Sequence, residues 1–305
     1  MSKETRIKEE QSKLRDLFVS LGIELLSSDE KVVTIRYRDA EWLRDGLTGL
    51  GVAARVSSGT VEIEPPKNEE AYRHLASSLK TVLAPEAVVF DVDDTLADVT
   101  ESYRRATVAT AEAFGARVTY DDITEAKAAG DANNDWELTW RLVRDRGIDV
   151  SIEEVTDKFE ELYQGTDEKP GLRAKETLIS PPGMIERLAA RTTLGIVTGR
   201  PRKDAFNFLE AQGLRKFFKV VVTMDDGPLK PDPTPCRLAL ERLEIERAWM
   251  VGDTPDDIRS ARGAGMLPLG VIAPADNPEV ARSALLEAGA GRVLTRISNI
   301  EELLP

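Results

Sequence analysis

The stretch Val88-Val89-Phe90-Asp91-Val92-Asp93-Asp94-Thr95-Leu96 decides how this chain folds. Its first three residues are apolar, which is typical of a strand buried in a parallel sheet. Carboxylates follow at once, although like charges repel and their burial is costly unless a cation or a proton compensates them. Asp91 and Asp93 are two residues apart, so both can face one small site beyond the strand. A divalent cation such as Mg²⁺ is the usual compensation, because it prefers carboxylate and phosphate oxygens.

A second apolar stretch, Leu194–Val197, also ends in polar residues. Thr198 can donate a hydrogen bond to a phosphate oxygen, and Gly199 lets the backbone approach a ligand closely. A third segment, Lys230-Pro231-Asp232-Pro233, follows another strand and places a positive charge on a backbone stiffened by prolines.

The fourth segment is Trp249-Met250-Val251-Gly252-Asp253-Thr254-Pro255-Asp256-Asp257. It is a strand followed by carboxylates and the start of a helix. Asp253 is a candidate metal ligand, and Asp257 is a further ligand or a support behind it. Each segment alone could be a turn, a solvated lysine or a helix cap, but four such segments in this order indicate one site.

In these four segments the sequence resembles the haloacid dehalogenase superfamily, over about residues 86–303. The resemblance implies that Asp91 is the nucleophile that takes up a phosphoryl group. It makes Asp93 the general acid and then the general base, and Thr198 and Lys230 the residues that hold the phosphoryl group. We expect Asp93 to stay protonated because its neighbours in the sequence are negative. Dehalogenase and phosphonate-cleaving members lack a carboxylate at this position, so Asp93 favours a phosphatase or, less often, a phosphomutase.

The same resemblance implies a Mg²⁺ cofactor. Asp91, Asp253 and the backbone carbonyl of Asp93 would hold it, and Asp257 would support this arrangement. Phosphoryl transfer needs positioning and charge neutralisation, which a metal, a lysine and backbone amides can supply.

Strands alternate with helices from Ala87 onward, which predicts a doubly wound, Rossmann-like parallel α/β sheet. The strands are expected near residues 87–91, 194–198, 219–223, 248–252, 268–272 and 292–294. The gap between Asp91 and Thr198 far exceeds the roughly 30 residues of a crossover. Helical patterns near 101–114, 120–129, 136–146 and 152–163 fill it, and the resemblance implies a helical cap inserted at 101–180.

One segment of this cap, Lys127–Trp136, is polar and interrupted by glycine. In capped members of the superfamily such a loop reads the leaving group of the substrate. The candidates for that role are Lys127, Asn133, Asn134 and Trp136, with Arg173 as a weaker one. The alternative is a solvated loop in which an Asn or Asp caps the next helix.

Residues 1–83 predict a small α+β domain with the order helix, strand, helix, two strands and helix. Over about 5–83 this pattern resembles the small C-terminal domain of histidinol-phosphate aminotransferases. Glu62 stands near the place where that family has a substrate-binding arginine, and the domain with the cofactor lysine is missing. We therefore expect no catalysis with pyridoxal phosphate, and a role in docking, homo-oligomerisation or packing.

Composition narrows the function further. A formal net charge of −13 and a pI of about 4.8 argue against nucleic-acid binding. One cysteine, Cys236, excludes a disulfide framework within the chain, and one histidine, His74, excludes histidine triads and multi-histidine zinc sites. No apolar run approaches the roughly 20 residues of a membrane span, and the charged N-terminus does not resemble a signal peptide. We expect a soluble, cytoplasmic protein.

Together these features predict a Mg²⁺-dependent phosphatase acting on a small phosphorylated metabolite through an aspartyl-phosphate intermediate. Histidinol phosphate and phosphoglycolate are the candidate substrates, and the aminotransferase resemblance favours the first only by association. A phosphosugar mutase is one alternative. A non-catalytic binding or regulatory protein on the same scaffold is another.

Overall fold

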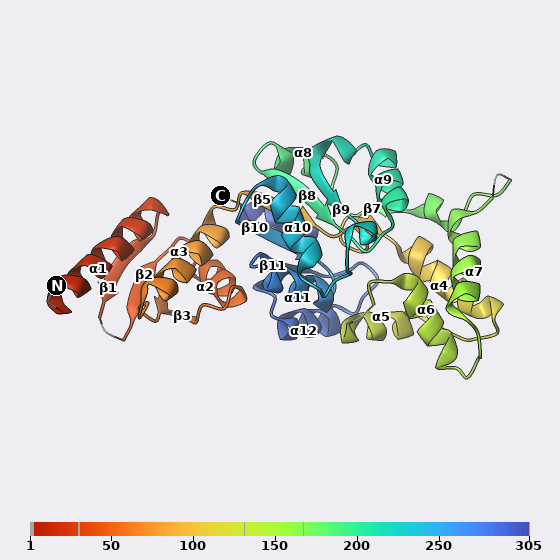
Figure 1. The fold of residues 1–305 in the computed structure, drawn as a ribbon, viewed down its shortest axis with the longest axis horizontal. Coiled ribbons are helices and arrows are strands. Elements are labelled where there is room, and N and C mark those ends of the chain that lie inside the picture. Colours follow the sequence, from red (N-terminus) through yellow and green to blue (C-terminus); the bar gives the residue numbers. More distant parts are fainter. Residues whose placement is uncertain (1–2, 30, 131, 167, 305) are drawn as a thin grey trace.

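The computed structural model describes residues 3–29, 31–130, 132–166 and 168–304 and consists of three parts along one long axis (Figure 1). An N-terminal unit lies at one end, a parallel sheet with its helices lies in the middle, and a group of helices lies at the other end.

The central sheet is parallel, and its six strands have the order β12-β11-β10-β5-β8-β9. All four residues of β5 are buried, as its apolar sequence predicts. The chain leaves β5 toward β8 and β9 on one side and later returns to β10 on the other. The switch point of the sheet therefore lies at β5, where such folds bind ligands.

The predicted strands of this sheet are confirmed to within one residue. They are β5 (Ala87–Phe90), β8 (Thr193–Val197), β9 (Phe218–Val222), β10 (Ala248–Gly252), β11 (Leu267–Val271) and β12 (Arg292–Leu294). The helices of this part are α8 (Met184–Ala189), α9 (Arg202–Ala211), α10 (Thr234–Leu243), α11 (Pro255–Gly263), α12 (Pro278–Ala288) and α13 (Ile300–Leu303).

A helical insertion separates β5 from β8. It contains α4 (Arg105–Ala113), α5 (Tyr120–Ala129), α6 (Asp135–Arg144) and α7 (Ile152–Gln164), close to the predicted ranges. The first predicted helix differs, because a wider helical turn, Thr100–Arg104, precedes α4. The insertion joins the core through two short antiparallel strands, β6 (Ala97–Asp98) and β7 (Thr177–Leu178). Residues of α4, α5 and α6 bury an apolar cluster of their own, whereas Phe159 and Tyr163 of α7 belong to the main core.

The N-terminal unit has a four-stranded antiparallel sheet with the order β1-β2-β4-β3. Its elements are α1 (Lys3–Ser20), β1 (Glu24–Ser28), β2 (Val33–Arg36), α2 (Ala40–Gly49), β3 (Ala54–Ser57), β4 (Thr60–Ile63) and α3 (Glu69–Leu83). The sequence pattern missed β1. Two of its five residues are serines, and it is an edge strand whose pairing with β2 is irregular between Leu25 and Ser27.

The N-terminal unit packs against the core at the end of the sheet away from Asp91 and Asp253. The indole Nε1 of Trp249 donates to the backbone oxygen of Thr81 at 2.6 Å, and its ring meets that of Trp42 with centroids 5.2 Å apart. Trp249 is the second residue of β10, whereas Asp253 follows the last. At about 3.3 Å per residue, these contacts lie roughly 13 Å from the carboxylates. Among the described helices, none is both long enough and apolar enough to cross a membrane.

Candidate active site

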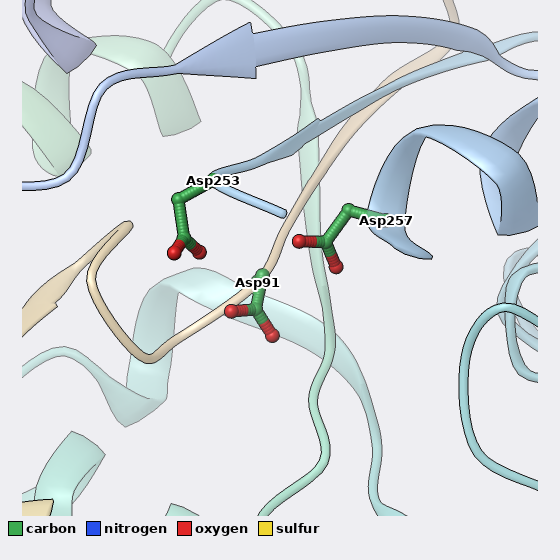
Figure 2. Close-up of side chains that lie close together, drawn as sticks. All are labelled: Asp91, Asp253 and Asp257. Carbon is green, nitrogen blue, oxygen red and sulfur yellow. The ribbon is translucent and has the colours of Figure 1, made fainter. Parts of the chain in front are cut away.

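Carboxylates from separate parts of the sequence converge at the carboxyl end of the sheet. One oxygen each of Asp91, Asp253 and Asp257 lies within 4.8 Å of the other two. Figure 2 shows the three side chains approaching one another from the ends of β5 and β10 and from the start of α11. All three residues are buried.

The loop after β5 curls back tightly on itself and so fixes its polar residues. Asp94 has a φ of 55°, and its backbone N–H donates to the oxygen of Ala97 at 2.8 Å. The N–H of Ala97 in turn donates to the oxygen of Val92 at 2.8 Å. The turn lets the Thr95 hydroxyl donate to Asp253 at 3.2 Å, which joins the first motif to the fourth.

Asp257 is held from both sides. The backbone N–H and hydroxyl of Thr254 donate to its Oδ2 at 3.0 and 2.6 Å in a capping box at the start of α11. The Nζ of Lys230 donates to its Oδ1 at 2.5 Å. A Cβ at Gly252 would lie 2.3 Å from Cγ of Asp257, so a side chain there would displace this carboxylate. Because both oxygens of Asp257 are engaged, Asp91 and Asp253 are better placed as direct ligands of a cation.

Lys230 is buried between two carboxylates. Its Nζ donates to Asp91 at 2.7 Å and to Asp257 at 2.5 Å. Burial acts to lower the pKa of Lys230, but Asp257 and Asp91 outweigh this effect and raise the pKa above its usual value. The ammonium therefore stays charged beside the nucleophile expected from the sequence.

The charge of the cluster is not fully compensated by protein groups. Burial raises the pKa of Asp91 from 3.8 to about 7, against the opposing effect of Lys230. Burial also raises the pKa of Asp253 well above its usual value, although Lys127 opposes this. Two oxygen donors with excess negative charge fit a hard divalent cation, so the residues present suit the Mg²⁺ that the sequence predicts.

These raised pKa values predict how a cation and pH affect stability. A carboxylate whose pKa is higher in the folded state lowers the stability above its unfolded pKa, and this loss is complete above the folded pKa. For Asp91 this window runs from 3.8 to about 7. We therefore expect Asp91 to make the metal-free protein more stable at about pH 5 than at about pH 8.

Thermal unfolding with a chelator and with Mg²⁺, at both pH values, tests this expectation. Mg²⁺ should raise Tm more at the higher pH, where no proton competes for the carboxylates. Asp253→Asn should remove most of the Mg²⁺ effect and stabilise the metal-free protein at the higher pH. A Tm that ignores Mg²⁺ at both pH values would contradict a cation site at Asp91 and Asp253.

The surroundings of Asp93 differ from the sequence expectation. The Nε and Nη2 of Arg200 donate to its Oδ1 at 2.8 and 2.5 Å. The expectation that the neighbours of Asp93 are negative therefore left out one group, because a cation distant in sequence pairs with it. The available signal was an arginine directly after Thr198 and Gly199 at the end of a strand.

Three of the candidate specificity residues of the helical insertion form hydrogen bonds with other residues of the protein. Lys127 donates to Oδ2 of Asp94 at 3.0 Å, and Asn133 donates to the backbone oxygen of Lys230 at 3.2 Å and to Oδ2 of Asp256 at 2.8 Å. Asn134 caps α6 by accepting from the N–H groups at 136 and 137. The contacts of Lys127 and Asn133 dock the loop on the core, whereas Asn134 also lines the cavity that is lined by Asp93. Asp131 within this loop lies outside the described residues.

The two remaining candidates line different cavities. The Nε1 of Trp136 donates to Glu160 at 3.0 Å, and the residue lines a cavity that also contains Asp93. Arg173 lines another cavity, beside Tyr163. The structure therefore does not bring it to the cluster of Asp91, Asp253 and Asp257.

Gly199 has a role that the sequence did not indicate. A Cβ at this position would lie 2.5 Å from the backbone oxygen of Asn133. The glycine therefore makes room for the loop of the insertion as well as for any ligand near Thr198.

Asp135 is a further residue of interest that the sequence analysis did not identify. It lines the cavity of about 20 Å³ that also contains Asp93, Tyr103 and Trp136. Its carboxylate accepts no hydrogen bond and forms no ion pair within the described part of the chain. Burial raises its pKa to about 6, against the opposing effect of Lys127. It resembles an ordinary acidic residue in the first turn of a helix, so its sequence context gave no signal.

Comparisons with known proteins show which family this chain is similar to. A sequence profile described as haloacid dehalogenase-like hydrolase matches residues 88–271, more than half of the chain. An imidazoleglycerol-phosphate dehydratase from Phytophthora nicotianae is 42% identical over 232 residues, which cover 72% of this chain but only 50% of that protein. A phosphorylated carbohydrates phosphatase from Thermotoga maritima is 29% identical and is matched over 67% of this chain and 92% of its own length.

A solved structure also matches. CbbY from Rhodobacter sphaeroides, crystallised in complex with phosphate, superimposes with a TM-score of 0.56 and is 26% identical. The match covers 71% of this chain and 96% of that structure.

Proposed function

The chain belongs to the haloacid dehalogenase-like hydrolases, and we propose that it is a Mg²⁺-dependent phosphatase that cleaves a small phosphorylated metabolite through an aspartyl-phosphate intermediate. One observation carries this proposal. Buried Asp91 is paired with a charged lysine, faces Asp253, and lies two residues before a second carboxyl group. This combination supplies a nucleophile, charge neutralisation and a proton donor at one place.

In the proposed first step, a carboxylate oxygen of Asp91 forms a bond to phosphorus. The phosphorus–ester oxygen bond breaks, and its electron pair leaves with the alcohol oxygen, which takes a proton from Asp93. Lys230 and the Thr198 hydroxyl stabilise the charge on the other phosphoryl oxygens. A bound Mg²⁺, held by Asp91, Asp253 and the backbone carbonyl of Asp93, would add positive charge at the same oxygens.

In the second step, Asp93 accepts a proton from a water molecule as the water oxygen bonds to phosphorus. The bond between phosphorus and Asp91 breaks, which releases inorganic phosphate and restores the carboxylate. Asp257 takes no part in bond making, because it is occupied in holding Lys230.

We propose histidinol phosphate, rather than phosphoglycolate, as the substrate. We place the leaving group beside Asp93. There Arg200 donates to Asp93 and Lys127 donates to Asp94, whereas Asp135 has no partner among the described residues. This surplus carboxylate favours a leaving group with a positive charge and disfavours one with a carboxylate. The name of the Phytophthora relative, which acts on a phosphate ester that bears an imidazole, points the same way.

Substitution of Asp135 by asparagine is expected to change substrate choice. The variant should lose about ten- to a hundredfold in kcat/KM for histidinol phosphate, because the leaving group loses an opposite charge. Phosphoglycolate hydrolysis should stay the same or rise. Steady-state kinetics on both substrates measure this, with Glu137→Gln on the exposed first turn of the same helix as the control. Equal losses on both substrates would mean that Asp135 does not read the charge of the leaving group.

Release of inorganic phosphate tests the proposed function as a whole. Purified protein with Mg²⁺ should release phosphate from histidinol phosphate faster than from phosphoglycolate or small sugar phosphates. A phosphosugar mutase would instead return the phosphoryl group to a sugar. A binding protein would release no phosphate from any compound, including p-nitrophenyl phosphate.

A further inference from the structure

We propose that Arg200 is a positioning residue that holds the carboxyl group of Asp93 for proton transfer and couples it to Glu176 at the base of the helical insertion. The inference rests on the proposed phosphatase reaction, in which Asp93 protonates the leaving oxygen. Arg200 itself needs no contact with the substrate in this role.

Arg200 engages both carboxylates with one planar group. Two of its nitrogens donate to Oδ1 of Asp93 at 2.8 and 2.5 Å, and the third donates to Oε2 of Glu176 at 2.9 Å. A guanidinium fork fixes direction as well as distance, which an ammonium cannot do. Arg200 therefore links the carboxyl group of Asp93 to Glu176.

The surroundings of Arg200 hold it in place. Only 1% of its side chain is exposed, and its guanidinium lies over the rings of Tyr103 and Phe208, 5.0 and 5.1 Å from their centroids. Glu176 is also constrained on its other side, because the hydroxyl of Tyr163 donates to its Oε1 at 2.9 Å. A charged group buried this deeply is stable only while these partners stay in place.

The position of Glu176 in the chain links this cluster to the insertion. Glu176 directly precedes β7, and β7 pairs with β6 at the point where the chain enters the insertion. Tyr163 lies on α7 of the insertion, whereas Arg200 follows β8 of the core. Any movement of the insertion about these two strands would therefore move Glu176 against Arg200 and release Asp93.

This arrangement predicts a dependence on the leaving group that a purely structural role would not produce. An alkoxide is a poor leaving group and needs a proton from Asp93 as the ester bond breaks. The p-nitrophenolate ion leaves with little help from an acid. Hydrolysis of the aspartyl phosphate, in which Asp93 is the base, is the same for both substrates and affects kcat, whereas kcat/KM reports only the steps up to that intermediate. Loss of the positioning residue should therefore lower kcat/KM much more for an alkyl phosphate than for p-nitrophenyl phosphate.

The experiment compares kcat/KM on both substrates for Arg200→Gln, Arg200→Lys and Glu176→Gln. Arg200→Gln should lower kcat/KM for histidinol phosphate by about 10²-fold and for p-nitrophenyl phosphate by less than about tenfold. Arg200→Lys should recover only part of the loss, since it restores charge without the fork. Glu176→Gln, which keeps size and Arg200 itself, should show a smaller loss with the same preference. Arg202→Gln, at an exposed arginine that pairs with Asp226, is the control and should resemble wild type.

The outcomes separate this inference from the proposed function. Equal losses on the two substrates, in Arg200→Gln and in the milder Glu176→Gln, would assign Arg200 to folding alone and overturn the inference while the phosphatase proposal stands. If Arg200→Gln fails to fold, Glu176→Gln decides by the same comparison. A wild-type protein that hydrolyses neither compound would overturn the proposed function and the inference with it.

Discussion

Replacement of Asp91 by asparagine should abolish phosphate release, with turnover lower by about 10⁴-fold or more. The amide lacks the charged oxygen that bonds to phosphorus, although its size is the same. Its carbonyl oxygen can still accept the hydrogen bond from Lys230, which lies 2.7 Å from Asp91, so the fold should be kept. Release of inorganic phosphate from histidinol phosphate and p-nitrophenyl phosphate, together with a thermal unfolding curve, measures both effects.

Asp16→Asn is the matched control, because Asp16 is an exposed carboxylate on α1 of the N-terminal unit, which packs at the other end of the sheet. It should keep wild-type turnover on both compounds. The Asp91→Asn variant should lose both substrates equally, unlike the variants at Arg200, since every substrate needs the nucleophile. Near-normal turnover without Asp91 would exclude the aspartyl-phosphate route.

The sequence predicted the central sheet well because its signals are local. Each strand is a short apolar run, and the polar residues that follow Phe90, Val197 and Gly252 lie at one edge of a parallel sheet. The meeting of Asp91 and Asp253 was therefore predictable from the positions of the strand ends, and that of Asp257 from the helix that begins directly after Asp253. The missed strand β1 shows the reverse case, because its serine-containing edge has no such pattern.

Partners distant in sequence were not predictable in the same way. Arg104 donates to Asp94 at 2.8 Å and to Asp276 at 2.8 Å, and Lys127 reaches Asp94 from another helix. Burial acts to raise the pKa of Asp94, but Lys127 and Arg104 outweigh it and hold the pKa below its usual value. The helical insertion and the core determine these pairs by how they pack, and no spacing in the chain encodes that packing.

Asp93 and Asp135 illustrate what this means for function. The motif around Asp93 predicts acid–base chemistry there, whereas the pairing with Arg200 depends on a residue more than a hundred positions later in the chain. Asp135 is an ordinary first-turn acid by sequence, and only the cavity it shares with Asp93 gives it a role in our proposal. Local motifs therefore predict the reaction class, whereas the proposal about selectivity depends on contacts between residues that are distant in sequence.

Replacement of Lys230 by methionine should weaken both the fold and the reaction. Methionine keeps an unbranched chain that is one atom shorter, and it leaves Asp91 and Asp257 buried together without the ammonium that now contacts both. Breaking a buried pair in this way commonly costs about 3–5 kcal/mol, and loss of a group that stabilises phosphoryl charge costs about 10²-fold or more in kcat.

The loss of stability in Lys230→Met should be largest at about pH 8 and should shrink toward about pH 5, because protonation of the carboxylates can then replace the missing charge. Denaturant unfolding at both pH values with a chelator present measures this, and Lys219→Met, at an exposed position of β9, is the control. A Lys230→Met variant as stable as wild type at the higher pH would show that the ammonium does not compensate these carboxylates, and the charge argument for the site would fail with it.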